Sequence, residues 1–202
     1  MKRKEKNNVI KILKITIGSI ILGLGIVFAN MTIGADPLSY FWQGVSVQLN
    51  ISLGFANLIV SFVLLLIPLI YDRKQINIGT ILSPVIIGLT IDSLLPRMPL
   101  ITSLAATALV FIFAVFCYTL GVAIYVKEDL GRSTYDGSID ILKDRAHISI
   151  KTAKTIADTV LFTLAILLGV PFAWGPFVFV LVSGTLIELF LNMLNKYDKI
   201  GA

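Results

Sequence analysis

Two acidic residues, Asp92 and Glu188, lie within long apolar segments of this 202-residue chain. Carboxylates inside a membrane span are costly and usually face the interior of a helix bundle or a water-filled cavity. In the functional interpretation, the two groups handle a proton or a cationic substrate. In the structural interpretation, they lie near helix ends and pair with Arg97 or Lys196. The sequence leaves both interpretations open.

Two further segments carry matching polar motifs, each a glycine followed by residues that commonly begin a helix. A helix N-terminus offers unpaired N–H groups to an anion. Acids already occupy both N-termini, however, which favours a structural role in helices that lie flat or shallow in the membrane interface. The motif residues are Gly34, Asp36 and Pro37 in the first segment and Gly131, Ser133, Tyr135 and Asp136 in the second.

No enzyme signature accompanies these acids. The chain has one His and one Cys, too few for a Cys/His metal centre or an intramolecular disulfide. An intramembrane aspartyl protease would need two acids at one depth, whereas Asp92 and Glu188 are predicted on opposite sides of the midplane. A third acid, Asp158, follows Lys154 by four residues, which favours a surface pair over a substrate site. We therefore expect no enzymatic activity, no cofactor and no bound metal.

The composition is that of an integral membrane protein. Hydrophobic residues make up 56% of the chain and charged residues 14%, whereas soluble domains carry about 25% charged residues. The net charge of +5 comes from residues beside apolar segments, which indicates membrane orientation rather than nucleic-acid binding. The expected partners are the lipid bilayer and a small-molecule substrate, without nucleic acid. The oligomeric state stays open.

Six transmembrane helices are predicted from the long apolar runs, since a span needs roughly 20 mostly apolar residues. The first is interpreted as a retained helix because its apolar part is longer than a signal-peptide core. The two polar motifs are expected to start amphipathic helices, one after the first span and one after the fourth. The predicted spans cover residues 13–33, 54–71, 76–95, 100–126, 153–169 and 173–194.

The basic residues indicate an orientation. With six spans, 16 of the 17 Lys and Arg residues fall on one side of the membrane and only Arg97 falls on the other. By the positive-inside rule, both termini are expected in the cytoplasm. One missing or extra span would spoil this asymmetry, so it also favours six.

The two halves of the chain resemble each other. Shifts of 97 and 96 residues align glycines and acids as well as apolar residues. Each half has three predicted spans, and because three is odd, the second half must enter the membrane inverted. Inverted three-span repeats are a common plan in secondary transporters. We expect a single membrane domain over residues 1–202, with repeats at about 13–95 and 100–194. Matched pairs include Gly34 with Gly131, Gly88 with Gly184, and Asp92 with Glu188.

Three stretches, IGADPLSYFWQGVS, LGRSTYDGSIDIL and INIGTILSPVIIGLTIDSLL, resemble the YczE/YyaS/YitT-like group of bacterial integral membrane proteins. The first half departs from the group's Gly-x-x-x-aromatic-Asp pattern, because Leu38 and Ser39 occupy the aromatic and Asp positions. The resemblance covers nearly the whole chain and implies a multi-pass protein of the bacterial cytoplasmic membrane, without a defined activity. The matching residues are Gly131, Tyr135 and Asp136, and then Gly79, Thr80, Gly88 and Asp92.

Two functions from different classes remain. The first is a small secondary transporter or permease for a small solute, proton-coupled through Asp92 or Glu188. The second is a non-transporting membrane scaffold or accessory subunit that docks a partner through its charged 127–154 segment.

Overall fold

The computed structural model describes the backbone of residues 2–131 and 133–200 and the side chains of residues 8–131 and 133–197. The regular structure of these residues is helical throughout, which confirms the predicted all-α class. Short 3-10 turns occur at Arg73–Gln75 and Leu95–Arg97. The α-helices are α1 (Lys2–Asn30), α2 (Pro37–Leu49), α3 (Leu53–Tyr71), α4 (Ile78–Leu94), α5 (Leu104–Lys127), α6 (Thr134–Ala146), α7 (Ile150–Leu167) and α8 (Gly175–Ile200).

Within the described part of the chain, five helices are long and apolar enough to cross a bilayer, one fewer than predicted. The difference is α7, which coincides with the predicted span at 153–169. Its 18 residues include three charged side chains, Lys151, Lys154 and Asp158, which is more than any of the five segments contains. The five segments are Asn8–Asn30, Leu53–Tyr71, Ile78–Arg97, Leu104–Lys127 and Gly175–Tyr197.

Helices α2 and α6 begin with the same local geometry. Gly34 and Gly131 precede them with φ values of +101° and +100°, a region that residues with a Cβ rarely adopt. Asp36 caps α2 and Ser133 caps α6, each accepting a hydrogen bond from a backbone amide in the first turn. Pro37 is the first residue of α2, where its missing N–H costs nothing.

The two short helices also end alike. Each has 13 residues. Each is followed by a residue in the left-handed conformation, Asn50 with φ of 53° and His147 with φ of 54°. The next helix then starts almost at once, with Ser52 capping α3 and Ser149 capping α7. The turn from α2 into α3 and the turn from α6 into α7 thus have similar backbone conformations.

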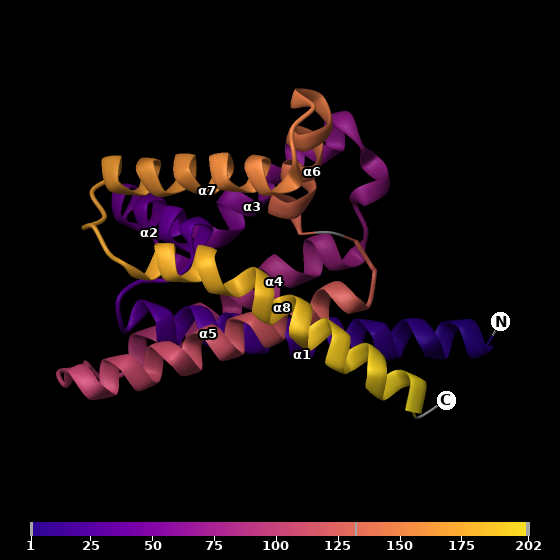
Figure 1. The fold of residues 1–202 in the computed structure, drawn as a ribbon, viewed down its shortest axis with the longest axis horizontal. Coiled ribbons are helices and arrows are strands. Elements are labelled where there is room, and N and C mark those ends of the chain that lie inside the picture. Colours follow the sequence, from indigo (N-terminus) through magenta and orange to yellow (C-terminus); the bar gives the residue numbers. More distant parts are fainter. Residues whose placement is uncertain (1, 132, 201–202) are drawn as a thin grey trace.

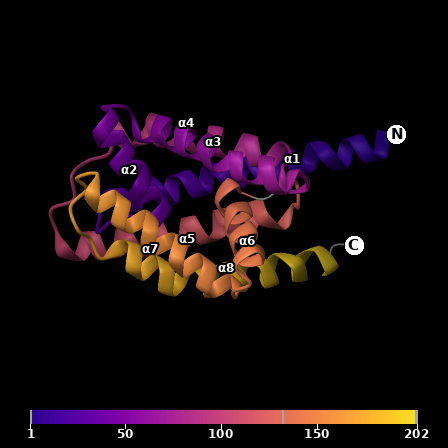
Figure 2. The same cartoon turned by 90° about the horizontal axis from the view of Figure 1, so that it is seen from above.

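The helices form two sides around a central pair (Figures 1 and 2). Helices α1 and α5 pack closely along their lengths. They run antiparallel, because Gly18 lies against Tyr125 whereas Gly25 lies against Ala114. Figure 2 shows α3 and α4 along one edge and α7 and α8 along the other. Helix α2 packs on α7, and α6 packs on α3. Both chain ends lie at the same end of the molecule (Figure 1).

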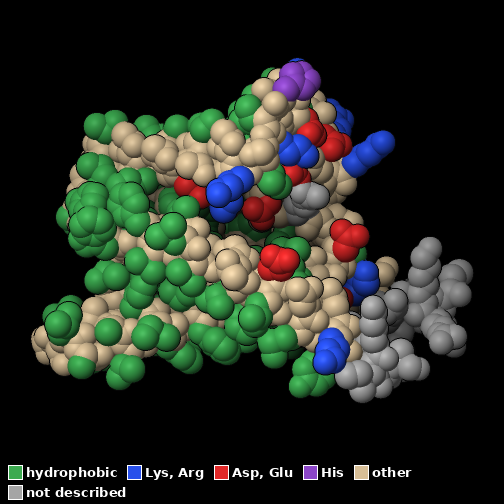
Figure 3. Space-filling model, viewed as in Figure 1, with side chains coloured by type: hydrophobic (Ala, Val, Ile, Leu, Met, Phe, Trp, Pro, Cys, Tyr) green, Lys and Arg blue, Asp and Glu red, His purple; other side chains and the backbone are tan. Residues whose placement is uncertain are grey.

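The packed interior is largest where α1 to α4 meet. Hydrophobic side chains dominate much of the visible face, and charged side chains gather toward the end that holds both termini (Figure 3). That distribution suits a molecule surrounded by lipid with one strongly charged end. The main buried cluster consists of Leu22, Ile26, Val27, Trp42, Leu53, Ala56, Val60, Ile87 and Ile91.

Candidate functional site

A cavity of about 170 Å³ lies where the N-termini of α2 and α6 approach each other inside the molecule. It is lined from α2 by Asp36 and Trp42 and from α6 by Tyr135 and Asp136, while Lys154 reaches it from α7. Polar side chains of α3, α4 and α8 complete the wall, among them Asn57, Ser61, Ser83 and Ser183. Ionisable groups at such a depth mark a functional site by default.

The Asp36 carboxylate is buried at the start of α2. It accepts hydrogen bonds from the hydroxyl and the backbone amide of Ser39. Burial raises the pKa of Asp36 above its ordinary value, whereas the Ser39 hydroxyl and the charge of Lys154 act in the opposite direction. Asp36 therefore has two roles that coexist, because it caps the helix and also lines the cavity.

On α6, Ser133 and Asp136 form a reciprocal pair. The Ser133 hydroxyl donates to Asp136 Oδ2 at 2.6 Å and accepts from the Asp136 amide at 3.0 Å. The Asp136 side chain is half-buried and lines the same cavity as Asp36. The two motifs that the sequence places about a hundred residues apart are thus brought to one site. Residues of both first turns line this cavity.

Asp158 is a site residue that the sequence did not identify. The spacing predicted a surface pair with Lys154, and the nitrogen–oxygen distance of 3.5 Å agrees with pairing. The predicted surface position is wrong, because Asp158 is only 5% exposed and accepts a hydrogen bond from the Tyr135 hydroxyl. Burial and the neighbouring Asp158 raise the pKa of the Tyr135 hydroxyl, so Tyr135 is held as a donor.

Trp42 is the second residue that the sequence did not connect with a site. In the structure Trp42 is 5% exposed and lines the cavity, and its indole N–H has no hydrogen-bond partner among the described residues. A buried donor without a partner is costly. Trp42 thus contributes to the cavity wall and carries a buried donor whose hydrogen-bonding capacity is unused among the described residues.

Asp92 and Glu188 are not brought together, and neither lines the cavity. Asp92 lies on α4 and accepts hydrogen bonds from the Ser52 hydroxyl at 2.6 Å and the Gly54 amide at 2.8 Å. It thereby ties α4 to the N-terminus of α3. Glu188 is exposed on α8 and has no such partner within the described part of the chain. Asp36 and Asp136 are the acids that line the cavity, and Asp158 is hydrogen-bonded to the lining residue Tyr135.

Comparisons with known proteins agree with the membrane fold and leave the activity open. The family of unknown function DUF6198 matches residues 9–194. An uncharacterized protein of Haemophilus influenzae is 25% identical over 185 residues, covering 89% of this chain and 83% of its own. The uncharacterized protein YyaS of Bacillus subtilis is 24% identical, covering 90% of this chain and 92% of its own. The uncharacterized membrane protein YczE of Bacillus subtilis is 20% identical, covering 86% and 82%. No solved structure matches significantly.

Proposed function

We propose that this chain, which belongs to the DUF6198 family of unknown function, is a small secondary transporter whose solute occupies the central cavity. The proposal rests on a difference in helix packing between the two sides of the molecule. Helix α3 packs tightly on α4, whereas α7 and α8 make few contacts and leave the cavity open between them. A transporter exposes its site to one side of the membrane at a time by closing one half and opening the other.

An inverted repeat is the framework of this proposal, with α1 to α4 as the first copy and α5 to α8 as the second. The antiparallel packing of α1 on α5 supports it, as do the matched starts and ends of α2 and α6. A pair of backbone hydrogen bonds supports it further. Gly79 donates to the Leu130 carbonyl at 2.9 Å, and Gly175 donates to the Ile33 carbonyl at 2.8 Å. Each bond ties the start of one copy's last helix to the segment before the other copy's short helix.

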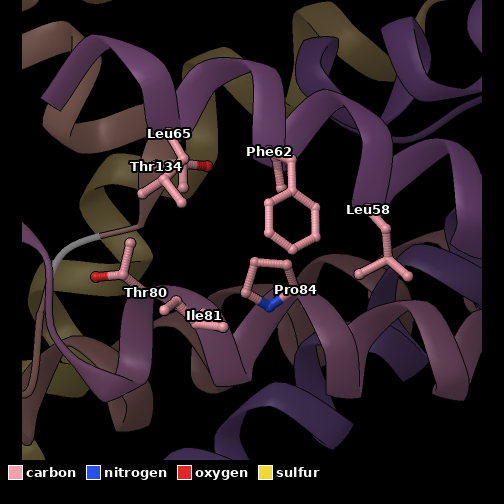
Figure 4. A pocket seen from close by; sticks show the side chains of 8 residues that line it. Leu58, Phe62, Leu65, Thr80, Ile81, Pro84 and Thr134 are labelled. Carbon is pink, nitrogen blue, oxygen red and sulfur yellow. The ribbon is translucent and has the colours of Figure 1, made fainter. Parts of the chain in front are cut away.

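The α3–α4 side is closed by close backbone contact. A Cβ on Gly54 would lie 2.2 Å from the Gly88 carbonyl oxygen, so only glycine fits there. Asp92 bonds to the start of α3 one turn further along α4, and the Asn57 amide donates to the Pro84 carbonyl at 2.7 Å. Figure 4 shows the neighbouring part of this contact, where Leu58, Phe62 and Leu65 of α3 lie opposite Thr80, Ile81 and Pro84 of α4. The space left there is about 10 Å³, room for a single water.

The α7–α8 side is open at the corresponding positions. A Cβ on Gly184, the counterpart of Gly88, would meet no atom within 4 Å. Within the described part of the chain, Glu188, the counterpart of Asp92, makes no hydrogen bond to Ser149, the counterpart of Ser52. The Ser149 hydroxyl is instead paired with Thr152. A groove of about 260 Å³ runs between the two helices, and Figure 3 shows the surface hollowed there, with acidic and basic side chains at the opening. Lys151 stands where the repeat would place a second Gly54, so α7 cannot approach α8 quite as closely.

The proposed transport cycle exchanges these two arrangements. In the second state, Ser149 at the start of α7 contacts Glu188 on α8, while Ser52 separates from Asp92. Such a two-state exchange of helix packing is a known route to alternating access. Under this proposal α7 also spans the membrane, which makes six spans in all. Both termini are then cytoplasmic, and the cavity of the present state opens to the cytoplasm. The solute is moved without chemical change, and the buried carboxylates couple its movement to protons.

Paired cysteines test the exchange. In a Cys117→Ala background, the Ser52→Cys/Asp92→Cys and Ser149→Cys/Glu188→Cys pairs are treated in native membranes with a short bifunctional thiol reagent. We expect the first pair to cross-link rapidly and the second to cross-link more slowly, as the molecule visits the other state. The four single-cysteine variants are the controls. If the Ser149→Cys/Glu188→Cys pair never cross-links, the proposal is wrong, because α7 and α8 then stay apart permanently.

The scaffold function remains the second candidate, on one observation. Asp144 and Arg145 are exposed at the end of α6, where Arg145 also lies over the Tyr71 ring of α3 at 4.5 Å. A partner that docks there would be captured from membranes by the unaltered chain and lost in an Asp144→Lys/Arg145→Glu variant. If the variant captures the partner as well as the unaltered chain does, α6 is not the docking site.

A further inference from the structure

We infer that the solute is a small organic cation that also carries a hydrogen-bond acceptor. This inference rests on the proposed transport function and names the class of molecule that its cavity would bind. It follows from the balance of charge around the cavity, from the donor that Trp42 leaves unpaired, and from the way in which the acids are held.

Among the residues that the structure describes, the charge around the cavity is negative. Asp36 and Asp136 line it, and Asp158 lies behind Tyr135, to which it is hydrogen-bonded. Lys154 also lines it, and its ammonium group is paired with Asp158 at 3.5 Å. The described part of the cavity wall therefore holds no further basic side chain for the remaining two carboxylates. Buried charges of one sign are stabilised when an opposite charge binds between them.

The two carboxylates retain capacity for a ligand. An ionised carboxylate has about four acceptor positions. Asp36 uses two of them for Ser39, and Asp136 uses one for the Ser133 hydroxyl. These bonds fix the carboxylates at the first turns of α2 and α6, which are themselves well ordered by their caps. Each carboxylate can therefore accept a further hydrogen bond from an ammonium or guanidinium group without displacing its cap.

The Trp42 indole determines the second feature of the solute. The indole N–H is buried and unpaired in the described structure, and the ring lines the cavity with Tyr118 and Tyr125. Aromatic faces attract organic cations, which agrees with the acids. The N–H is a donor only, so it needs a hydroxyl, carbonyl or ether oxygen on the same molecule. A simple anion would satisfy Trp42 but would be repelled by Asp36 and Asp136.

Calorimetric titration of the detergent-purified full-length protein tests this inference with three probes of similar size: ethanolamine, propylamine and propionate. We expect both amines to bind, ethanolamine more tightly because its hydroxyl accepts from Trp42, and propionate not to bind. Asp36→Asn and Asp136→Asn should each weaken both amines about tenfold; Asn also caps helices well, so the Asp36 variant keeps its fold. Trp42→Phe should remove the advantage of ethanolamine over propylamine, a ratio that is insensitive to partial unfolding.

The matched control is Asp144→Asn, which removes the same charge at an exposed position outside the cavity and should change neither affinity. Propionate binding as tightly as the amines, no binding by either amine, or amine binding that is unaffected by both cavity substitutions would overturn the inference. The cysteine experiment separates the two proposals. If the amines bind but the Ser149→Cys/Glu188→Cys pair does not cross-link, the cation site is supported and the transport proposal is contradicted. If the pair cross-links but the amines do not bind, the transport proposal is supported and the cation inference is contradicted.

Discussion

The Asp92 carboxylate accepts a hydrogen bond from the Ser52 hydroxyl at 2.6 Å and so joins α4 to the residue that caps α3. The Gly54 amide donates to the same carboxylate at 2.8 Å, at the positive end of the α3 dipole. An acid inside an apolar segment is thus explained by a contact between two helices. In the proposed cycle this contact is formed on one side of the molecule while the equivalent contact on the other side is broken.

Asp92→Ala should therefore destabilise the protein, whereas Glu188→Ala should not. The first substitution removes an acceptor from the start of α3, and the loss of a comparable cap costs about 1–2 kcal/mol. Glu188 is exposed and has no partner in the described part of the chain, so its removal leaves this state unchanged. Unfolding in mixed detergent micelles, followed by circular dichroism, measures both. Equal stability of the two variants would show that the Asp92 contact contributes nothing.

Much of the fold could be predicted from the sequence because its determinants are local. The start of α2 needs a glycine at positive φ, an acid as cap and a proline in the first turn, and all three are adjacent in Gly34, Asp36 and Pro37. The apolar lengths of α1, α3, α4, α5 and α8 likewise depend on composition alone. The position of helix α7 in the sequence was predicted correctly. Because the helix carries three charged residues, its role as a membrane span is part of the proposed function.

The site could not be predicted, because it depends on contacts between distant residues. Asp158 has the spacing of a surface pair with Lys154, and only the packing of α6 on α7 buries it under Tyr135. The sequence alignment pairs Asp92 with Glu188. Their different surroundings follow from the packing of α3 on α4 and the separation of α7 from α8, which no spacing in the sequence records.

Gly88→Ala and Gly184→Ala form a matched pair of substitutions on the closed and open sides. A Cβ at residue 88 would lie 2.8 Å from the Gly54 carbonyl oxygen, so we expect a loss of about 1–3 kcal/mol in unfolding free energy. At residue 184 the space is open, and alanine should leave the stability unchanged or raise it slightly. Thermal unfolding in detergent provides the comparison.

Gly184→Ala should nevertheless slow the cross-linking of Ser149→Cys with Glu188→Cys, because α8 must approach α7 in the second state. Gly184→Ala would thus impair the exchange between the two states without lowering the stability of the protein. Unchanged cross-linking in the Gly184→Ala background would argue that the two helices close through another surface.

The affinity for an organic cation should fall with decreasing pH earlier than an ordinary aspartate would allow. Burial raises the pKa of Asp36, and protonation removes the negative charge that attracts the cation, so binding weakens as the pH falls through this raised pKa. Lys154 and Asp158 of α7, Asp136 of α6 and Tyr118 of α5 also face this region. Titrations with ethanolamine between pH 4 and pH 8 should show the loss, and Asp36→Asn should make the profile flatter. A profile that is the same in both proteins would assign the titration to another group.

The Tyr135 hydroxyl and Asp158 should be strongly coupled in stability. In Tyr135→Phe, the buried Asp158 loses its donor and retains only Lys154 at 3.5 Å, so we expect a loss of about 1–3 kcal/mol. In an Asp158→Asn background the same substitution should cost less, because the charge that needed the donor is gone. Tyr197→Phe, at a residue that is 72% exposed, is the matched control and should be neutral. Equal costs of Tyr135→Phe in both backgrounds would mean that the contribution of the hydroxyl does not depend on the charge of Asp158. A smaller cost in the Asp158→Asn background would show that the cavity wall depends on a buried charge that the Tyr135 hydroxyl of α6 stabilises.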